Sequence, residues 1–405
     1  MAQSKEAVEG GTLDDLLERL AAFEPTGLPF ISLYLNAQAN ENGRADFDRF
    51  VRKEFGQRAR TYAANSPERE SFDRDVEKIE EYLANELRPE SNGVAVFACA
   101  GAGDFFEAAQ FEAPVEHQRL YIYNQPHLYP LARLAGQFPR YAVLVADTNR
   151  ARLFVFGRGK TLKAEDVQNV KTRRSQVGGW SQMRYQRHLE NYHLQHAKEV
   201  AEALERTLRE DNIEHVILAG DEVIIPLLKE QFPKAVAEKV VDALSLPIDA
   251  PEHEILEASA EAMREHDAET DAAKVEQLLN DYRAGGLAVV GSQDTLEALS
   301  MGQVEELIIT ARQQHVEGDR EDVAILSDSE VVEPVVAGAD GAVANIDADS
   351  LIVAGDLVTR AQQTSARITF VEDPALLAEV GGVGAILRYR IEPPTTDSAP
   401  QPQHA

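Results

Sequence analysis

The chain has 405 residues, of which 44% are hydrophobic and 27% charged, so it can form two to four domains with sizeable cores. No apolar run is long enough to cross a bilayer, and the first residues lack the charged-then-apolar pattern of a signal peptide. The single cysteine, Cys99, excludes an internal disulfide and a multi-cysteine zinc site. A net charge of −29 repels nucleic acid on average, so any RNA contact requires a local basic patch. These features predict a soluble cytoplasmic protein that does not associate with membranes.

The first third of the chain, residues 1–135, predicts one α/β domain. A capping-box pattern at Thr12–Asp15 precedes apolar residues at helical spacing, so a helix is expected there. Further along, the pattern predicts two strands and two charged helices, at 30–35, 93–98, 44–64 and 67–88.

Residues 136–272 predict a central α/β domain. Apolar runs at 141–146 and 151–156 flank a turn at 147–150 and predict a hairpin. A long helix is expected at 183–210, because its apolar and aromatic residues share one face. A strand at 216–220 and a helix at 223–229 follow.

Residues 275–392 predict a third, compact α/β domain. A charged helix or helix pair at 251–282 precedes it, and Gly285 and Gly286 break that helix. The predicted strands and helices of this domain are 287–291, 294–301, 304–310, 355–364 and 367–371. Residues 311–350 are acidic and predict an extended excursion, whereas 393–405 have the composition of a disordered tail.

Two glycine-containing stretches resemble nucleotide-binding motifs, but neither has glycine at all the positions that its motif requires. The triplet Gly159–Thr161 resembles the end of a phosphate-binding loop, but Phe154 stands where that loop requires its first glycine. The pair Gly101 and Gly103 begins a dinucleotide fingerprint, but Phe106 stands at the position of the third glycine.

Histidines and aspartates provide two minor alternatives. His188, His193 and His196 share one predicted helix without a carboxylate at metal-binding spacing, so packing or RNA contact is favoured over a metal site. Asp147 and Asp221 each follow a strand, where they could hold Mg²⁺ in a nuclease site or simply form turns. We favour the turns and expect neither a metal nor another cofactor.

A basic segment, residues 171–187, carries the strongest functional signal. Its sequence, KTRRSQVGGWSQMRYQR, contains no acid, although 69 of the 405 residues are Asp or Glu. Gly178 and Gly179 allow a close approach of the backbone to a partner, and Trp180 offers a face on which a base can stack. The alternative is a basic surface loop with a buried tryptophan. The candidate phosphate-binding cations are Lys171, Arg173, Arg174, Arg184 and Arg187.

The segment from Gly178 to Arg187, GGWSQMRYQR, resembles the release-factor loop G-G-Q-S-x-x-R-F-x-R, and Ser181 is among the identical positions. Residues 286–309 and 381–389 resemble the opening and the closing strand of the release-factor C-terminal domain. The chain is thus similar to the bacterial relatives of archaeo-eukaryotic release factors and Pelota. That group includes the hibernation factor Balon and relatives of the peptidyl-tRNA hydrolase of ribosome quality control.

This resemblance implies a three-domain tRNA mimic with an RNase H-like central α/β domain and a release-factor-like C-terminal α/β domain. It implies binding to large-subunit rRNA at the ribosomal A site, and a translational GTPase is a further possible partner. Two activities stay open: A-site binding for hibernation or rescue, and peptidyl-tRNA hydrolysis with Gln182 orienting water. In release factors a glutamine follows the two glycines, but here Trp180 follows them, and tryptophan lacks an acceptor. No counterpart of the N-I-K-S stop-codon motif is present, so codon-specific termination is not expected.

Overall fold

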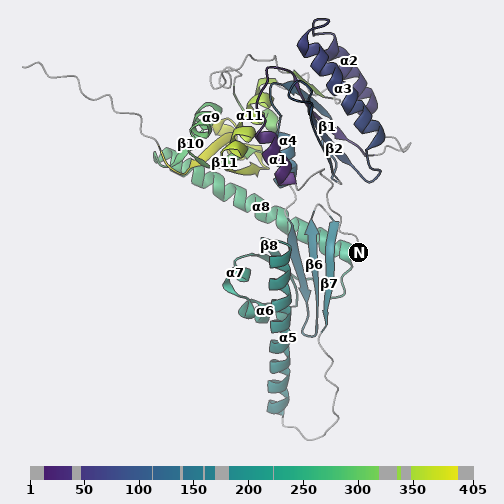
Figure 1. Cartoon of the computed structure of the whole chain (residues 1–405). Coiled ribbons are helices and arrows are strands. Elements are labelled where there is room, and N and C mark those ends of the chain that lie inside the picture. Colours follow the sequence, from purple (N-terminus) through teal and green to yellow (C-terminus); the bar gives the residue numbers. More distant parts are fainter. Residues whose placement is uncertain are drawn as a thin grey trace, which may run out of the picture. The chain divides into compact units, whose positions relative to one another are not determined.

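The computed structural model describes residues 13–38, 47–111, 113–136, 140–157, 160–168, 182–221, 223–318, 335–338 and 348–390. The chain is mixed α/β, as predicted, and forms two compact units (Figure 1). Unit 1 combines residues 1–136 with 271–405, and unit 2 contains residues 137–270. The boundary lies within helix α8 (Glu252–Arg283), which contributes its first part to unit 2 and its second part to unit 1. No helix within the described ranges is long and apolar enough to span a membrane.

Unit 1 contains a five-stranded antiparallel sheet in the order β12-β4-β1-β2-β3. The predicted strands at 30–35 and 93–98 are confirmed as β1 and β2. The other three strands were not predicted, and β12 reaches this sheet from within the acidic stretch 311–350. The strands are β1 (Phe30–Asn36), β2 (Gly93–Cys99), β3 (Phe105–Phe111), β4 (Arg119–Tyr123) and β12 (Val335–Gly338).

Two helices cover one face of this sheet. Helix α2 (Phe47–Ala59) and helix α3 (Pro67–Asn85) pack their apolar residues against β1 and β2. Phe72 is fully buried there, which stabilises the fold by about 2–3 kcal/mol. Helix α3 begins where its sequence dictates, because the Ser66 hydroxyl accepts a hydrogen bond from the backbone N–H of Arg69.

The opposite face of the sheet shares a core with a second sheet of unit 1. This sheet has the order β10-β14-β11-β13, with β11 and β13 parallel and the other pairs antiparallel. One continuous core contains residues of both sheets and of four helices. Those helices are α1 (Leu13–Ala21), α4 (Tyr129–Gly136), α9 (Ser292–Ser300) and α11 (Ala348–Gln363). The strands are β10 (Ala288–Val290), β11 (Val304–Thr310), β13 (Arg367–Val371) and β14 (Val383–Leu387).

Several elements of unit 1 match the sequence patterns closely. Helix α1, strand β13 and the break after α8 lie where they were predicted. The segment 251–282 is one helix rather than a pair. Two 3-10 helices, η1 (Gln313–His315) and η3 (Pro374–Val380), complete the described part of this unit. The predicted division of unit 1 into an N-terminal and a C-terminal domain stays a prediction, and the predicted tail, 393–405, lies outside the described residues.

Unit 2 has one five-stranded sheet in the order β7-β6-β5-β8-β9, which is 3-2-1-4-5 in chain order. The first three strands are antiparallel, and β5, β8 and β9 are parallel. This is the RNase H-like arrangement that the resemblance implied. Strand β7 was not predicted. The strands are β5 (Tyr141–Ala146), β6 (Arg150–Gly157), β7 (Lys160–Gln168), β8 (His215–Gly220) and β9 (Val240–Leu244).

Helices cover both faces of this sheet. Helix α5 (Gln182–Glu210) and helix α6 (Ile224–Gln231) pack on one face, and the first part of α8 packs on the other. The short helix α7 (Lys234–Ala237) leads into β9. The long helix predicted at 183–210 is thus confirmed within one residue at its start.

Candidate functional site

The basic segment connects two well-defined elements of unit 2. It follows the edge strand β7, which ends at Gln168, and it runs into helix α5, which begins at Gln182. The glycines, Trp180, Ser181 and the first three cations of the segment lie outside the described residues. For Gln182, Arg184 and Arg187 the structure assigns the backbone to the first two turns of α5.

The N-terminus of α5 is electropositive for a physical reason. A helix carries about half a positive charge at its N-terminus, because the first backbone N–H groups have no partner within the helix. The first turn of α5 contains no acidic residue, and the first acid along the helix is Glu190. The dipole and the arginine charges therefore add, which favours an anion such as a phosphate.

The C-terminal half of α5 is held firmly against the sheet. Ala197, Val200 and Leu204 are buried in the core that this helix shares with β5, β6 and β8. In Figure 1 the other half of α5 projects beyond the ends of these strands. With 29 residues the helix is about 43 Å long, so a rigid element positions the start of α5 away from the core of its own unit.

The histidines of α5 have unlike surroundings. His196 is fully buried, and neither of its ring nitrogens has a hydrogen-bond partner. His193 is half-buried, and its ring centroid lies 6.3 Å from that of Tyr192. The side chain of His188 lies outside the described residues. No group of three potential metal ligands occurs among the residues that the structure places, and His196 is used in packing.

Asp147 and Asp221 follow the neighbouring parallel strands β5 and β8, as predicted. The Oδ1 atom of Asp147 accepts hydrogen bonds from the backbone N–H groups of Asn149 and Arg150, both at 2.7 Å. Oδ1 of Asp221 accepts from the backbone N–H groups of residues 223 and 224, at 3.0 and 2.9 Å. Both carboxylates therefore shape the local chain, one in the hairpin turn and one at the start of α6.

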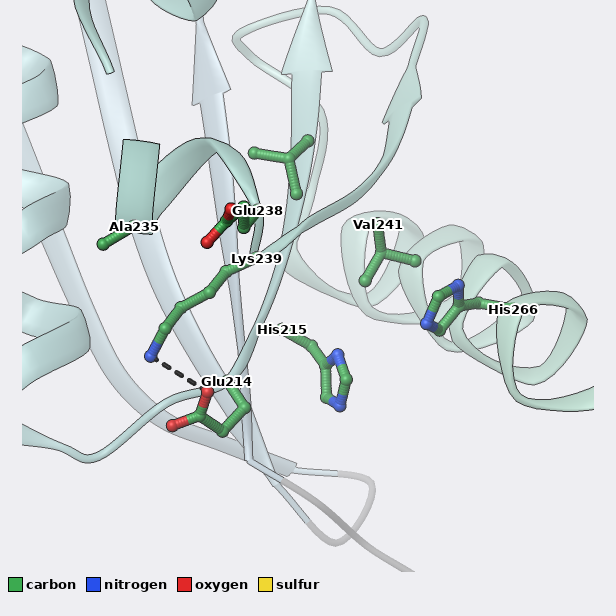
Figure 2. A pocket seen from close by; sticks show the side chains of 8 residues that line it. Glu214, His215, Ala235, Glu238, Lys239, Val241 and His266 are labelled. Atoms are coloured by element: carbon green, nitrogen blue, oxygen red, sulfur yellow. Dashed lines mark ion pairs between the residues drawn. The ribbon is translucent and has the colours of Figure 1, made fainter. Parts of the chain in front are cut away.

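A pocket of about 440 Å³ lies at the opposite end of β8 (Figure 2). Two of its lining residues, His215 on β8 and His266 on α8, have ring centroids 5.7 Å apart. Glu214 forms an ion pair with Lys239, with 3.1 Å between the carboxylate oxygen and Nζ. The remaining lining residues are Ala235, Glu238, Val240 and Val241.

Two titratable groups in and beside this pocket have pKa values that shift in opposite directions. Burial, together with the neighbouring ring of His266, lowers the pKa of His215. Burial raises the pKa of Asp267, which follows His266 on α8. The wall thus combines the Glu214–Lys239 ion pair with the imidazole rings of His215 and His266.

Sequence reasoning did not find the His215–His266 pair. The two residues are far apart along the chain, and no local spacing links them. Only the pairing of β8 in the sheet and the packing of α8 on its face bring them together.

Comparisons with known protein families match two consecutive parts of the chain. Residues 126–265 match the family described as bacterial archaeo-eukaryotic release factor family 10. Residues 268–391 match eRF1 domain 3. The chain belongs to the bacterial archaeo-eukaryotic release factor and Pelota superfamily.

Among release-factor relatives, peptide chain release factor subunit 1 of Methanopyrus kandleri is 24% identical over 331 residues, which are 76% of each chain. The Pelota homolog of Thermococcus kodakarensis is 24% identical over 182 residues, which are 43% of this chain and 48% of that protein. A structure described as ribosome-bound archaeal Pelota and ABCE1 is 15% identical, covering 95% of this chain and 96% of that one, with a TM-score of 0.39.

The basic segment lies inside the region matched to the release-factor family, and so do β7 and α5. The position that follows Gly178 and Gly179 is the clearest departure from the release-factor loop, because Trp180 replaces the glutamine. An indole N–H can donate a hydrogen bond but offers no acceptor. The segment therefore resembles the release-factor loop in its basic residues but has no glutamine at this position.

Proposed function

We propose that this protein is a ribosome-associated tRNA mimic that occupies the A site during hibernation or rescue. The observation that carries the proposal is the acid-free basic segment 171–187, which ends in the positive N-terminus of α5. Membership of the release-factor and Pelota superfamily supports it. The proposed place of action is the cytoplasm, and a translational GTPase is the proposed delivery partner.

Each part of the segment has a role in this proposal. Lys171, Arg173, Arg174, Arg184 and Arg187 contact phosphates of the large-subunit rRNA, where each contact gains from the release of counterions. Trp180 stacks on a base, which contributes about 1–3 kcal/mol. Gly178, Gly179 and Ser181 allow the backbone to approach the RNA closely. Because the chain as a whole carries a net charge of −29, RNA contact depends on local basic segments such as this one.

Co-sedimentation of the purified protein with 70S ribosomes and 50S subunits tests this proposal. We expect binding that weakens as salt increases, since phosphate contacts release counterions. Arg184→Ala with Arg187→Ala is expected to lower the affinity at least tenfold. The matched control is Arg206→Ala with Arg209→Ala, which removes two exposed arginines from the other end of α5. Absence of co-sedimentation, or equal loss with the control, would contradict the proposal.

Peptidyl-tRNA hydrolysis is the second candidate. It is favoured by Gln182, whose backbone begins α5 two residues after Trp180. In this proposal its amide, or a neighbouring backbone N–H, orients water against the peptidyl ester, and the rate gain comes from positioning.

Release of nascent chains from stalled 50S complexes distinguishes the two candidates. If the Gln182 amide orients the water, Gln182→Ala abolishes release, whereas Gln195→Ala, which changes an exposed glutamine further along α5, leaves release unchanged. Binding without release would leave the A-site role as the function, and release that is indifferent to Gln182→Ala would exclude this amide from the chemistry.

A further inference from the structure

Four chain segments of unit 1 meet at one end of the sheet β10-β14-β11-β13. The backbone N–H of Leu387 donates to the carbonyl of Leu287, at 2.9 Å, and the N–H of Arg388 donates to the carbonyl of Gln303, at 2.8 Å. The Arg390 guanidinium donates to the carbonyl of Gly285, at 3.0 Å. These bonds join the end of α8, the start of β10, the turn between α9 and β11, and the residues after β14.

This end of the sheet exposes large apolar side chains. Of six large hydrophobic residues that are exposed in the described part of the chain, four belong to these segments: Tyr282, Leu287, Met301 and Tyr389. Their exposed fractions lie between 43% and 48%. Single exposed hydrophobic residues are ordinary on a protein surface, but a group of them marks an interaction site.

The same segments are depleted of acid and rich in arginine. Residues 282–290, 298–304 and 380–390 contain no Asp or Glu, in a chain with 69 acids among 405 residues. Arg283, Arg388 and Arg390 are exposed. None of the three forms an ion pair with a carboxylate within the described ranges, and the last two donate only to backbone carbonyls, of Ser365 and Gly285. Their positive charges are therefore not neutralised by this unit.

We infer that this arginine–tyrosine surface, made of Tyr282, Arg283, Leu287, Met301, Arg388, Tyr389 and Arg390, docks a protein that presents carboxylates around an apolar anchor. Tyrosine, methionine and arginine are enriched in protein interfaces, and acidic residues are depleted there. Leu287 and Met301 gain from burial against apolar side chains, which favours a protein over an RNA backbone. The inference does not rest on the proposed function, because its residues lie in unit 1 and the basic segment lies in unit 2.

Site-specific photocrosslinking with the full chain tests the inference. Met301 is replaced by p-benzoyl-phenylalanine, the cells are irradiated, and the crosslinked peptide of the partner is identified by mass spectrometry. The same replacement at Leu162, an exposed residue of unit 2, provides the background. The partner is then purified and titrated with the wild-type chain and with variants.

The expected result is a protein adduct at a segment that contains Asp or Glu. Arg388→Glu with Arg390→Glu weakens binding at least tenfold, and replacing the partner's crosslinked acids by arginine restores most of that loss. The control Arg52→Glu with Arg60→Glu makes the same charge change on exposed arginines of helix α2 and the residues after it, and it leaves binding unchanged. If the Glu variant fails to fold, as judged by circular dichroism, Arg388→Gln with Arg390→Gln replaces it.

Four outcomes would overturn the inference. They are an RNA adduct, an adduct with a second copy of this chain, no adduct above the Leu162 background, and equal weakening by the control variant. Ribosome co-sedimentation is scored separately, so failure of this inference and failure of the proposed function are distinguishable.

Discussion

Asp356 is a carboxyl group enclosed in the core of unit 1. It lies on α11 and is 2% exposed. The Gln125 amide donates to its Oδ1, and Oδ2 has no hydrogen-bond partner. Burial outweighs the opposing influences of Arg360 and Gln125 and raises the pKa of Asp356 to about 7. The carboxyl group is therefore protonated in the folded state at pH values where it is ionised in the unfolded chain.

Replacing Asp356 by asparagine should change how stability depends on pH. In the wild type the folded pKa of about 7 exceeds the unfolded value of about 3.9, so stability is lost as pH rises from 4 to 7. Asp356→Asn remains neutral and avoids this loss. We expect its unfolding free energy, relative to wild type, to increase by about 2–4 kcal/mol between pH 4.5 and pH 8 in urea titrations.

The stability of the variant must be compared with that of the wild type at each pH, because burial also raises the pKa of Asp75 to about 7. This second carboxyl group makes stability depend on pH in both proteins. Asp294→Asn, at an exposed position on α9, provides the control and should run parallel to wild type. Parallel curves for Asp356→Asn as well would show that this carboxyl group is ionised in the folded protein.

Gly382 occupies a backbone position that excludes a side chain. Its φ is +78°, and a Cβ atom there would lie 2.2 Å from the backbone oxygen of His315. Gly382→Ala should therefore lower the unfolding free energy by about 3 kcal/mol or more. Gly103 has a φ of +72° with nothing within 4 Å of a Cβ, so Gly103→Ala should cost only about 1 kcal/mol. Equal losses in chemical denaturation would show that His315 moves aside freely.

At the scale of elements, helix α5 carries a polar side chain in its packed half. His196 is fully buried in the core, and both of its ring nitrogens lack a hydrogen-bond partner. An unpartnered buried polar group costs about 1–3 kcal/mol. His196→Leu should therefore stabilise unit 2 by about 1–2 kcal/mol and raise its melting temperature by roughly 3–6 °C. Calorimetry measures the shift, Gln195→Leu on the exposed face is the control, and an unchanged or lower melting temperature would contradict the expectation.

The sequence predicted the elements that bury their own apolar residues. Helix α5 has a strong periodic pattern and the β5–β6 hairpin has two apolar runs, and the bounds of these elements were found within one or two residues. Strand β7, with the sequence KTLKAEDVQ, has few apolar residues and exposes its Leu162 by 47%. It is a strand because it pairs with β6 along its length, a non-local cause that no local pattern reveals.

The candidate sites also differ in whether local sequence or non-local packing reveals them. The basic segment 171–187 is contiguous, so composition and the release-factor resemblance were enough to single it out. The pocket at His215 and His266 and the arginine–tyrosine surface are assembled from distant segments by sheet pairing. Their residues are ordinary one by one, and only the fold brings them together.

At the scale of the whole molecule, unit 2 is inserted between two parts of unit 1. The two cores of unit 2 contain only residues between 141 and 263. The main core of unit 1, in contrast, joins α1 and α4 from before the insertion with α9, α11 and a sheet from after it. Unit 2 therefore has complete cores of its own, whereas residues 13–136 complete only the core beneath α2 and α3 and share the other with residues that follow the insertion.

This arrangement predicts how fragments of the chain fold. Residues 140–270 alone should melt cooperatively, and residues 13–136 alone should not, because the face that α11 covers would be exposed. The two parts of unit 1 should fold together when a short Gly-Ser linker replaces residues 137–270. The junctions permit this, because both sides contact Glu372: its carboxylate lies 3.4 Å from the Arg133 guanidinium, and its backbone N–H donates to Asp271 at 3.2 Å. Calorimetry of the three proteins measures the transitions. A cooperative transition of residues 13–136 alone would instead support an independent N-terminal domain, as the sequence predicted.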